Sequence, residues 1–363
     1  MILRNQLILE SKVNQGFHVG RHIISHGHKP FVIAEMSANH NQSFDRAMQI
    51  VEAAARAGVH ALKLQTYTAD TLTIDIKENE FFISDESSLW YGKSLYELYQ
   101  SAYTPWEWHE AIFKRCNELG LIAFSTPFDV TAVNFLETLN VPLYKIASFD
   151  IINHELIKAV SKTGKPVIIS TGLANLSEIS EAVQTAQEAG CSNLVLLKCT
   201  STYPASPIDS NILTIPSMHS IFKCPVGLSD HTLGIGAAIA SVALGACVIE
   251  KHFTLSRADG GVDAAFSLEP DEMTQLVHES ARAFDSLGKI TYQPTESELA
   301  SKRYRRSLYV TKDLKPGDSL TEDNIRAIRP GLGLSPKYLS SLIGKKAKKE
   351  IKRGTPLSWQ LLD

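Results

Sequence analysis

The sequence lacks a long hydrophobic run, a paired-cysteine motif and the pattern of a signal peptide. Its most apolar stretch, residues 235–250, is rich in Gly and Ala and is shorter than the ~20 apolar residues that a membrane helix needs. The first residues show none of the charged, apolar and small-residue zones of a signal peptide. The five cysteines are odd in number and lack CxxC spacing, which favours reduced, buried thiols over disulfides. We therefore expect a cytoplasmic protein that does not interact with membranes.

The charge is small overall but unevenly distributed. The chain carries a formal net charge of −3, yet residues 301–363 hold 15 Lys and Arg against 6 Asp and Glu. A basic tail can bind nucleic acid, but this one lacks aromatic residues interleaved with its basic clusters. We expect no nucleic-acid partner, and we interpret the basic region as a docking surface for the acidic remainder of the chain or for an anionic substrate.

Eight short apolar runs alternate with segments of helical periodicity. The runs cover residues 31–36, 61–66, 122–127, 143–148, 166–171, 194–200, 225–230 and 248–253. The segments between most of them have apolar positions three and four residues apart, which is typical of amphipathic helices. Eight strand–helix units in roughly 250 residues predict a TIM (β/α)8 barrel. An open doubly wound sheet is the alternative, and it is disfavoured because no Gly-rich dinucleotide loop follows the first run.

Changes in pattern predict the domain boundaries. Residues 1–30 predict a short hairpin or cap, residues 31–288 the barrel, and residues 289–303 a polar linker. Residues 304–363 predict a separate small domain of short strands and tight turns. One longer excursion, residues 68–104, interrupts the rhythm of the barrel, and its paired aromatic residues indicate an ordered loop over the mouth.

The last two apolar runs each carry an acid and then a histidine at the end. Asp230 precedes His231, and Glu250 lies two residues before His252. Residues 233–246 predict a helix between the two runs, so they form a βαβ unit whose parallel strands end on the same side of the sheet. The two histidines should then lie close together, as a divalent metal site requires. A hydrogen-bonded structural role is the alternative for either histidine alone.

Two histidines make a sparse metal site. A catalytic zinc usually has three protein ligands, so a metal bound here would be completed by water, by substrate or by a carboxylate such as Glu250. This donor set favours an exchangeable Mn²⁺ or Mg²⁺ ion.

Because the active site of a TIM barrel forms at the C-terminal ends of its strands, the last polar residues of each run predict the walls of the site. These residues are Glu35, Lys63 with Gln65, Ser125 with Thr126, Lys145 with Ser148, Ser170 with Thr171, Lys198 with Thr200, Ser229 with His231, and Glu250 with His252. Lys63 and Lys145, surrounded by hydroxyls, form a cradle for phosphate and carboxylate groups. Lys145 could instead form a Schiff base with a carbonyl substrate. Residues 39–41, Asn-His-Asn, are interpreted either as a helix N-cap region or as a substrate contact.

Six motifs resemble those of the sialic acid synthase family. They are Ala-Glu-Met-Ser-Ala-Asn-His-Asn at 34–41, Lys-Leu-Gln at 63–65, Ser-Thr-Pro-Phe at 125–128, Tyr-Lys-Ile-Ala-Ser at 144–148, Gly-Leu-Ser-Asp-His-Thr at 227–232 and Glu-Lys-His-Phe-Thr at 250–254. Arg-Pro-Gly-Leu-Gly at 329–333 is similar to the antifreeze-protein-like (SAF) domain of the same enzymes. The resemblance spans nearly the whole chain. It implies a transferase that condenses phosphoenolpyruvate with an N-acetylated amino sugar, releases phosphate and makes a nine-carbon nonulosonic acid.

The resemblance also implies a role for each site residue. Phosphoenolpyruvate would be held by Lys63, Gln65, Thr126, Lys145, Ser148, Ser170 and Ser229. The metal, Mn²⁺ with Mg²⁺ or Co²⁺ as alternatives, would be held by His231 and His252. The sugar would contact Glu35, Tyr203, Asp263 and Arg329, the last of them supplied by the other subunit of a domain-swapped homodimer. Glu35 and the two histidines would be catalytic, and Glu250 could aid proton transfer.

Two departures from the neuraminate synthases narrow the substrate. They lie at residues 37–42 and 260–268, and both resemble the pseudaminic acid synthase branch of the family. The sugar of that branch is 2,4-diacetamido-2,4,6-trideoxy-L-altrose, and its methyl and second acetamido groups lead us to expect apolar contacts at Val262, Ala264 and Phe266. Ser201, where relatives often carry Asn, leaves one polar contact open. The alternatives are N-acetylneuraminate or legionaminic acid synthesis by the same chemistry, a Schiff-base barrel aldolase, and a non-catalytic sugar-binding relative.

Overall fold

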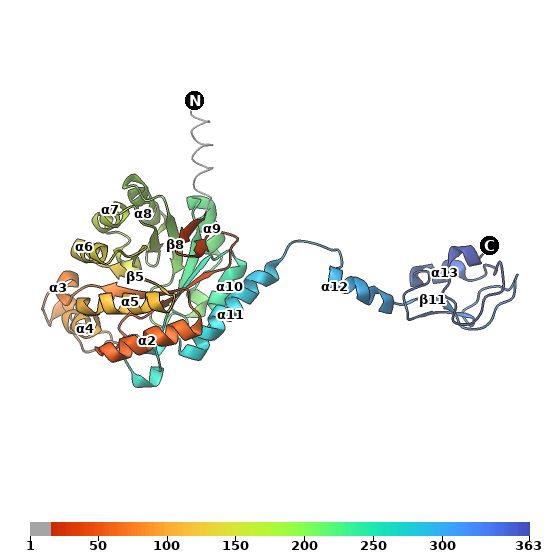
Figure 1. Ribbon diagram of the computed structural model, residues 1–363, viewed down its shortest axis with the longest axis horizontal. Helices are drawn as coiled ribbons and strands as arrows, with labels where there is room; N and C mark the ends of the chain where they lie inside the picture. Colours follow the sequence, from red (N-terminus) through yellow and green to blue (C-terminus); the bar gives the residue numbers. More distant parts are fainter. Residues whose placement is uncertain (1–15) are drawn as a thin grey trace, which may run out of the picture. The chain divides into compact units, whose positions relative to one another are not determined.

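The computed structural model describes residues 16–363, and its first unit, which ends at Gly288, contains a closed barrel of eight parallel strands (Figure 1). The strands are β3 (Phe31–Glu35), β4 (Ala61–Thr66), β5 (Ile122–Pro127), β6 (Tyr144–Ile146), β7 (Val167–Ser170), β8 (Leu194–Cys199), β9 (Val226–Asp230) and β10 (Val248–His252). They follow one another in chain order, and β10 closes the barrel by pairing with β3. The predicted TIM barrel is confirmed, and an open sheet is excluded.

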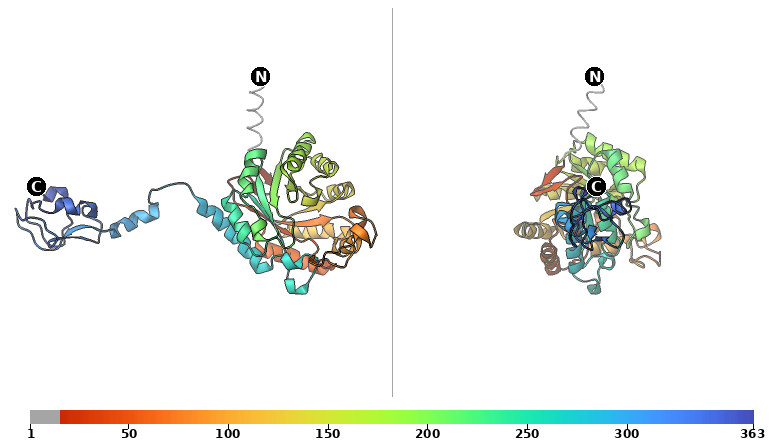
Figure 2. Two further views of the ribbon diagram at one scale, coloured as in Figure 1. Left: turned by 180° about the vertical axis from the view of Figure 1, so that it is seen from behind. Right: turned by 90° about the vertical axis from the view of Figure 1, so that its right-hand side faces the viewer.

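Helices cover the outside of the barrel. They are α2 (Phe44–Ala57), α5 (His109–Glu118), α6 (Val130–Thr138), α7 (His154–Ser161), α8 (Leu176–Glu188), α9 (Thr214–Phe222), α10 (Gly236–Ala243) and α11 (Pro270–Leu287). Three of these helices, α2, α10 and α11, pack side by side on one flank of the barrel, and α11 lies between the other two (Figures 1 and 2). The first of them, α2, is far from α10 and α11 in the sequence. Local signals set the limits of the first helix: Ser43 Oγ accepts the N–H of Arg46, and Gly58 ends the helix at a left-handed φ of 78°.

Side-chain alternation along the strands divides the barrel interior into two layers. The lower layer is apolar and is formed by Phe31, Ile33, Ala61, Phe124, Leu143, Ile168, Val195, Leu197 and Val248. Because side chains on one face of a strand recur every second residue, the next inward positions toward the C-terminal ends form a second layer. That layer holds Glu35, Lys63, Thr126, Lys145, Ser170 and Glu250, so the interior changes from apolar to charged within one side-chain repeat.

A hairpin packs against the apolar layer. Strands β1 (Phe17–Val19) and β2 (His22–Ile24) pair antiparallel and add Phe17, Val19 and Ile24 to the lower cluster, next to the start of β3. This hairpin was predicted within residues 1–30, and the part of that prediction that concerns residues 1–15 lies outside the described residues.

The excursion after β4 is ordered, as predicted. It contains α3 (Ala69–Leu72), a 3-10 turn at Asn79–Phe81, α4 (Leu95–Ala102) and a second 3-10 turn at Trp106–Trp108. A capping box starts α4, in which Ser94 and Glu97 bind each other's backbone N–H groups.

Two elements are shorter than the sequence predicted. The helix expected over residues 233–246 is α10, Gly236–Ala243, because Gly234 takes a left-handed φ of 70° and residues 233–235 form a turn. The strand expected to reach residue 148 ends at Ile146, because the chain enters a 3-10 turn at Ser148–Asp150.

The second unit, Lys289–Asp363, has its own small core. It contains α12 (Glu296–Leu299), a 3-10 turn at Ala300–Tyr304, the antiparallel pair β11 (Ser307–Val310) and β12 (Ile325–Ile328), and α13 (Leu339–Leu342). Its core comprises Leu308, Val310, Leu314, Leu320, Ile325, Leu342, Ala347, Ile351, Leu357 and Leu362. The short strands and turns predicted for this region are present.

All five cysteines are free and buried, as predicted. Within residues 16–363, no helix combines the length and the apolar character that crossing a bilayer would require.

A buried ion pair connects the last two strands on the outer side of the barrel. Lys251 Nζ donates to Asp230 Oδ2 at 2.8 Å and to the Thr232 carbonyl at 2.5 Å, and Asp230 and Lys251 are direct partners in the register of β9 and β10. Each residue directly precedes a histidine of the predicted metal site, and both side chains are almost fully buried.

We predict that Lys251→Met lowers the free energy of unfolding by roughly 3–5 kcal/mol, because it leaves the Asp230 carboxylate buried without its cation. Urea denaturation measures the effect. Lys158→Met is the matched control, since the Lys158–Glu155 pair is exposed and such pairs contribute ~1 kcal/mol or less. Equal losses in the two variants would contradict a special contribution of the buried pair.

Candidate functional site

The charged layer of the barrel interior is the candidate site. Lys63 lies between two carboxylates: its Nζ contacts Glu35 Oε2 and is 3.7 Å from Glu250 Oε2. It also donates to Thr126 Oγ1 at 3.0 Å. The three partners come from β3, β10 and β5, so closure of the barrel is what brings them together.

Lys145 is bound on the opposite side of the same carboxylate. Its Nζ donates to Ser170 Oγ at 2.6 Å and to the Ile146 carbonyl at 3.2 Å, and it is 3.6 Å from Glu250 Oε1. Ser229 Oγ donates to that same Glu250 oxygen at 3.0 Å. Glu250 therefore links the two lysines into one buried network.

Burial and ion pairing oppose each other in this network. Burial lowers the pKa of Lys63, but the carboxylates of Glu250 and Glu35 outweigh it and raise that pKa overall, whereas burial prevails at Lys145 and lowers its pKa. Burial raises the pKa of Glu35 in spite of Lys63, while Lys145 and Lys63 overcome burial and lower the pKa of Glu250. Because two lysines face two carboxylates, an anion that binds here competes with Glu35 and Glu250 for both cations.

The predicted histidine pair is formed. The rings of His231 and His252 lie 5.3 Å apart between centroids. His231 Nδ1 is 2.9 Å from the Thr200 carbonyl, and because a carbonyl can only accept, Nδ1 carries the proton and Nε2 keeps its lone pair. His252 Nδ1 is buried and has no hydrogen-bond partner among the described residues, and burial together with the neighbouring His231 lowers the pKa of His252 well below its usual value.

These features fit a metal with few protein ligands. Both rings offer a nitrogen lone pair, and the nearest carboxylate, Asp263 Oδ2, is 3.8 Å from His252 Nδ1. In the described part of the chain, no group of three or more His, Cys, Asp or Glu side chains is arranged to hold a metal. A cation bound by the two imidazoles would keep its remaining positions for water or substrate.

An aromatic wall and one carboxylate complete this side of the site. The Tyr203 ring lies 4.5 Å from the His231 ring and 5.1 Å from Phe266, and Phe266 lies 4.9 Å from His252. Asp263 is buried, and its Oδ2 accepts a hydrogen bond from Ser37 Oγ.

The remaining predicted residues occupy different surroundings. Ser148 Oγ accepts the N–H of Gly172 at 3.1 Å, and a Cβ on that glycine would lie 2.2 Å from Ser201 Oγ, so Ser148 and Ser201 flank one tight turn. Gln65 lies half-buried one repeat beyond Lys63 on the same face of β4. Arg329 follows β12 in the second unit, where it is exposed.

Four predicted wall residues do not line the site. Thr171 and Thr200 follow the inward Ser170 and Cys199, and their hydroxyls donate to the Leu197 and Asp209 carbonyls. Lys198 follows Leu197, which belongs to the inner cluster, so alternation turns Lys198 outward, where its Nζ donates to the Cys199 carbonyl at 2.8 Å. Ser125 likewise follows the inward Phe124, and its hydroxyl lies 2.6 Å from Thr66 Oγ1. The prediction was wrong for all four because it took the last polar residues without fixing the face of the strand.

The side chains of residues 39–41 form hydrogen bonds to other loops. The N-cap of α2 is Ser43, so the N-cap interpretation is wrong. Asn39 Nδ2 donates to the Phe253 carbonyl and Ser267 Oγ, His40 Nε2 lies 3.1 Å from Thr104 Oγ1, and Asn41 Nδ2 donates to the Gly260 carbonyl.

Sequence reasoning missed two residues near the site. Cys199 Sγ lies 3.9 Å from His231 Nδ1 and 3.6 Å from Ser201 Oγ. It sits at an inward position two residues after Leu197, so alternation identifies it only once the face of the strand is known. Trp90 belongs to the paired aromatic residues that predicted a loop over the mouth, but its contact with Tyr203, at 5.9 Å between ring centroids, was not predicted, because no local pattern indicates it.

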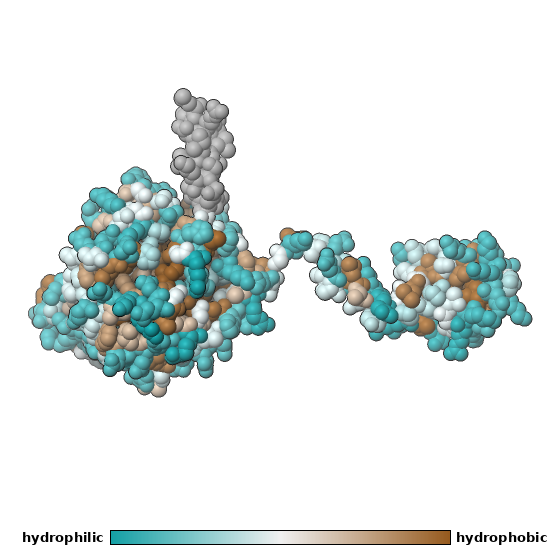
Figure 3. Space-filling view, in the orientation of Figure 1, coloured by the Kyte–Doolittle hydropathy of each residue, from teal (hydrophilic) through white to brown (hydrophobic). Residues whose placement is uncertain are grey.

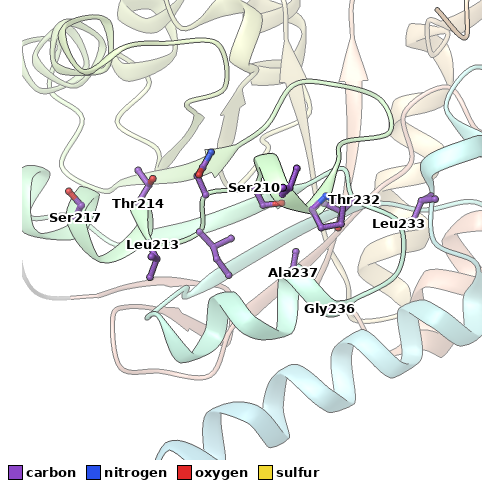
Figure 4. Close-up of a pocket in the computed structure, with 12 residues that line it drawn as sticks. Ser210, Leu213, Thr214, Ser217, Thr232, Leu233, Gly236 and Ala237 are labelled. Carbon is purple, nitrogen blue, oxygen red and sulfur yellow. The ribbon is translucent and has the colours of Figure 1, made fainter. Parts of the chain in front are cut away.

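A separate hollow lies outside the charged layer. Its volume is about 720 Å³, and it is lined by the 207–214 segment and by residues at the start of α10, including Leu233, Gly236 and Ala237 (Figure 4). It contains none of the residues that were predicted to bind substrate or metal.

Figure 3 shows hydrophobic residues grouped on the first unit within a mostly hydrophilic surface. Exposed apolar side chains follow several of the barrel strands, namely Phe149, Ile152, Leu173, Ile208 and Leu233.

Comparisons with known proteins agree with this architecture. The NeuB family model matches residues 50–292, and the SAF domain model matches residues 305–363. A pseudaminic acid synthase of Campylobacter jejuni is 42% identical over 91% of this chain and 95% of its own length. An N,N'-diacetyllegionaminic acid synthase of Legionella pneumophila is 36% identical over 92% of this chain and 94% of its own. The crystal structure of an N-acetylneuraminic acid synthetase from Leptospira borgpetersenii, in complex with citrate, superposes with a TM-score of 0.71 at 33% identity, covering 79% of this chain and 95% of that one.

The pH dependence of stability tests the electrostatics around Lys145. Burial raises the pKa of Asp150 to about 6 in spite of Lys145. A carboxyl group whose pKa is higher in the folded state binds its proton more tightly there, so its contribution to stability is present at low pH and is lost as the pH rises toward 6. We predict that the unfolding free energy of Asp150→Asn, relative to the unmodified protein, increases between pH 4 and pH 7.

Urea denaturation at several pH values gives this comparison. Asp75→Asn, at an exposed aspartate of the excursion, is the matched control, and its difference from the unmodified protein should stay constant over the same range. A constant difference for Asp150→Asn as well would show that burial does not alter its titration.

Proposed function

The chain belongs to the NeuB family, and from this premise we propose that it condenses phosphoenolpyruvate with 2,4-diacetamido-2,4,6-trideoxy-L-altrose and water to give pseudaminic acid and phosphate. The observation that carries the proposal is the pair of buried lysines, Lys63 and Lys145, at the open end of the barrel and next to two imidazoles. One half of the site is suited to a small, highly charged anion, and the other to a polarised carbonyl group. The 42% identity to a pseudaminic acid synthase supports this sugar.

The lysine half would bind phosphoenolpyruvate. Lys63 and Lys145 would contact its phosphate and carboxylate groups, with hydroxyls from Thr126, Ser148, Ser170 and Ser229 and the amide of Gln65 completing the cradle. The lysines are held by hydrogen bonds to Thr126 and Ser170, so they would stay oriented while the anion replaces the carboxylates beside them. They would stabilise the negative charge through every step of the reaction.

The histidine half would bind a divalent metal, Mn²⁺ by preference, through His231 and His252. When bound, such an ion polarises the aldehyde of the open-chain sugar and lowers the pKa of a bound water. Carbon 3 of phosphoenolpyruvate then attacks the aldehyde carbon, water adds at carbon 2, and the tetrahedral product loses phosphate by C–O cleavage. The buried residues of this chain would hold the two substrates next to each other and limit the access of bulk water.

The two glutamates would divide the proton transfers. Glu35 pairs with His252 in the register of β3 and β10, so it would lie beside the reacting carbonyl, and burial raises its pKa, which favours a role in accepting and returning a proton. Glu250 is held by Lys63, Lys145 and Ser229, and its lowered pKa keeps it ionised. Its role would be to orient the lysines, with proton transfer as a secondary function.

Tyr203 and Asp263 would contact the sugar, and Arg329 would come from the second unit of a partner subunit in a swapped homodimer. The exposed apolar residues after β6 to β9 support a partner at the mouth. The basic character of residues 301–363 against the acidic remainder of the chain supports the same arrangement by charge complementarity.

Phosphate release with different sugars tests the proposal. With phosphoenolpyruvate and Mn²⁺, we predict that kcat/KM for the altrose derivative exceeds that for N-acetylmannosamine by roughly tenfold or more, because unpaired polar groups and lost apolar contacts each reduce transition-state binding. A preference for N-acetylmannosamine or for the legionaminic acid precursor would keep the chemistry and overturn the branch. No release with any sugar would favour the aldolase or the non-catalytic relative, and borohydride trapping of Lys145 would distinguish these two.

Metal removal tests the histidine half. Chelation should abolish phosphate release, and added Mn²⁺ should restore it. His252→Gln should lower kcat by roughly a hundredfold, the scale for loss of one electrostatic stabiliser. His219→Gln is the matched control, because His219 stacks on His26 away from the site and should leave kcat unchanged. Full activity in excess chelator would contradict a metal-dependent mechanism.

A further inference from the structure

The excursion after β4 reaches the sugar side of the site through one tryptophan. Trp90 Nε1 donates to the Val262 carbonyl at 3.0 Å, and its ring lies 5.9 Å from the Tyr203 ring. The hydrogen bond joins residues that are 172 positions apart in the chain. Trp90 thus contacts both segments that carry the proposed sugar-binding residues, Tyr203 after β8 and Asp263 after β10.

The loop of residues 260–268 depends on contacts from other segments. Asn41 Nδ2 donates to the Gly260 carbonyl, and Gly261 takes a φ of 128° with its hypothetical Cβ only 2.4 Å from Asn41 Oδ1, so only glycine fits there. On its inner side the loop presents Asp263 and Phe266, which are both buried. These contacts hold the loop at its start, Ser37 and Asn39 hold Asp263 and Ser267 from the β3 side, and Trp90 adds a contact from the excursion at Val262.

Val262 borders a hollow beside the excursion. Together with Leu89, Trp90, Lys93 and Ala265 it lines this hollow of about 480 Å³, whereas Ala264 and Phe266 are buried. The apolar contact that we expect between the Val262 side chain and the sugar stays a prediction. The Val262 carbonyl, bound to the indole N–H, is the part that fixes the loop.

We propose that Trp90 is a positioning residue for sugar recognition, acting through Val262 and Tyr203 on the placement of Asp263 and Phe266. The inference rests on the proposed function, and it adds a residue from the excursion to the sugar half of the site. Neither contact of Trp90 involves the lysine network, which comes from the strands. Binding of the sugar and binding of phosphoenolpyruvate should therefore respond differently to changes at Trp90.

Two variants separate the two contacts. Trp90→Phe keeps an aromatic ring beside Tyr203 and loses the N–H donor, and it should raise KM for the sugar about three- to tenfold, the range for one hydrogen bond. Trp90→Ala loses both contacts and should raise it further. In both variants KM for phosphoenolpyruvate should stay within a factor of about two, and the preference for the altrose derivative over N-acetylmannosamine should fall.

Trp108→Phe is the matched control. Trp108 packs edge-on against His40 and Phe44 and touches neither Tyr203 nor Val262, so its sugar KM should remain unchanged. An unchanged sugar KM in both Trp90 variants, or an equal rise in KM for the two substrates, would overturn the proposal.

Hydrogen–deuterium exchange gives a readout that does not depend on turnover. Trp90→Phe should increase exchange in residues 260–268 and leave the barrel strands unchanged, while Trp108→Phe should not affect that loop. If the unmodified protein releases no phosphate with any sugar, the proposed function fails, and exchange in the loop still tests the positioning role. Unchanged exchange in Trp90→Phe would overturn that role.

Discussion

The desolvation of four ionisable groups inside the barrel is the constraint on which the site depends. Lys63 and Lys145 lie in an interior whose next layer is apolar, and each needs a counter-charge to remain there. Glu35 and Glu250 supply that charge, and Glu250 reaches both lysines. Because the four residues come from β3, β4, β6 and β10, the network forms only in a closed barrel. The hairpin β1–β2 and the apolar layer lie below the network, so the charged groups are accessible from the C-terminal ends of the strands.

The same network explains how a neutral cluster can accept an anion. With both lysines paired, the site carries no large excess of charge before a ligand binds. An anion bound at the lysines, as proposed, would displace the carboxylates in part, and burial, which raises the pKa of Glu35, would favour proton uptake by that residue. Glu250, whose pKa is lowered, stays ionised between the two lysines. Pairing therefore keeps the cations in place at a cost that the incoming ligand can overcome.

The site is built from two kinds of structure. The lysines lie on strands whose spacing the barrel sets, and His231 and His252 lie at the ends of β9 and β10, whereas Tyr203, Asp263 and Trp90 lie on loops. Loops tolerate change better than strands do, and relatives that are named for different nonulosonic acids align with this chain over most of its length. The structure is consistent with one shared chemistry on the strands and with variable sugar recognition on the loops.

The sequence by itself determined the barrel, the strand-end residues and the proximity of His231 and His252. These follow from two general rules, the two-residue repeat of a strand and the common direction of strands in a βαβ unit, and neither rule needs coordinates. Tertiary structure alone decided that Lys198 and Ser125 face outward, since the face of a strand depends on its register in the sheet. It also decided the pairing of Glu35 and Glu250 with the lysines and the contact of Trp90 with Val262. Those contacts join residues far apart in the chain, and their geometry depends on the packing of whole segments, which no local pattern of residues encodes.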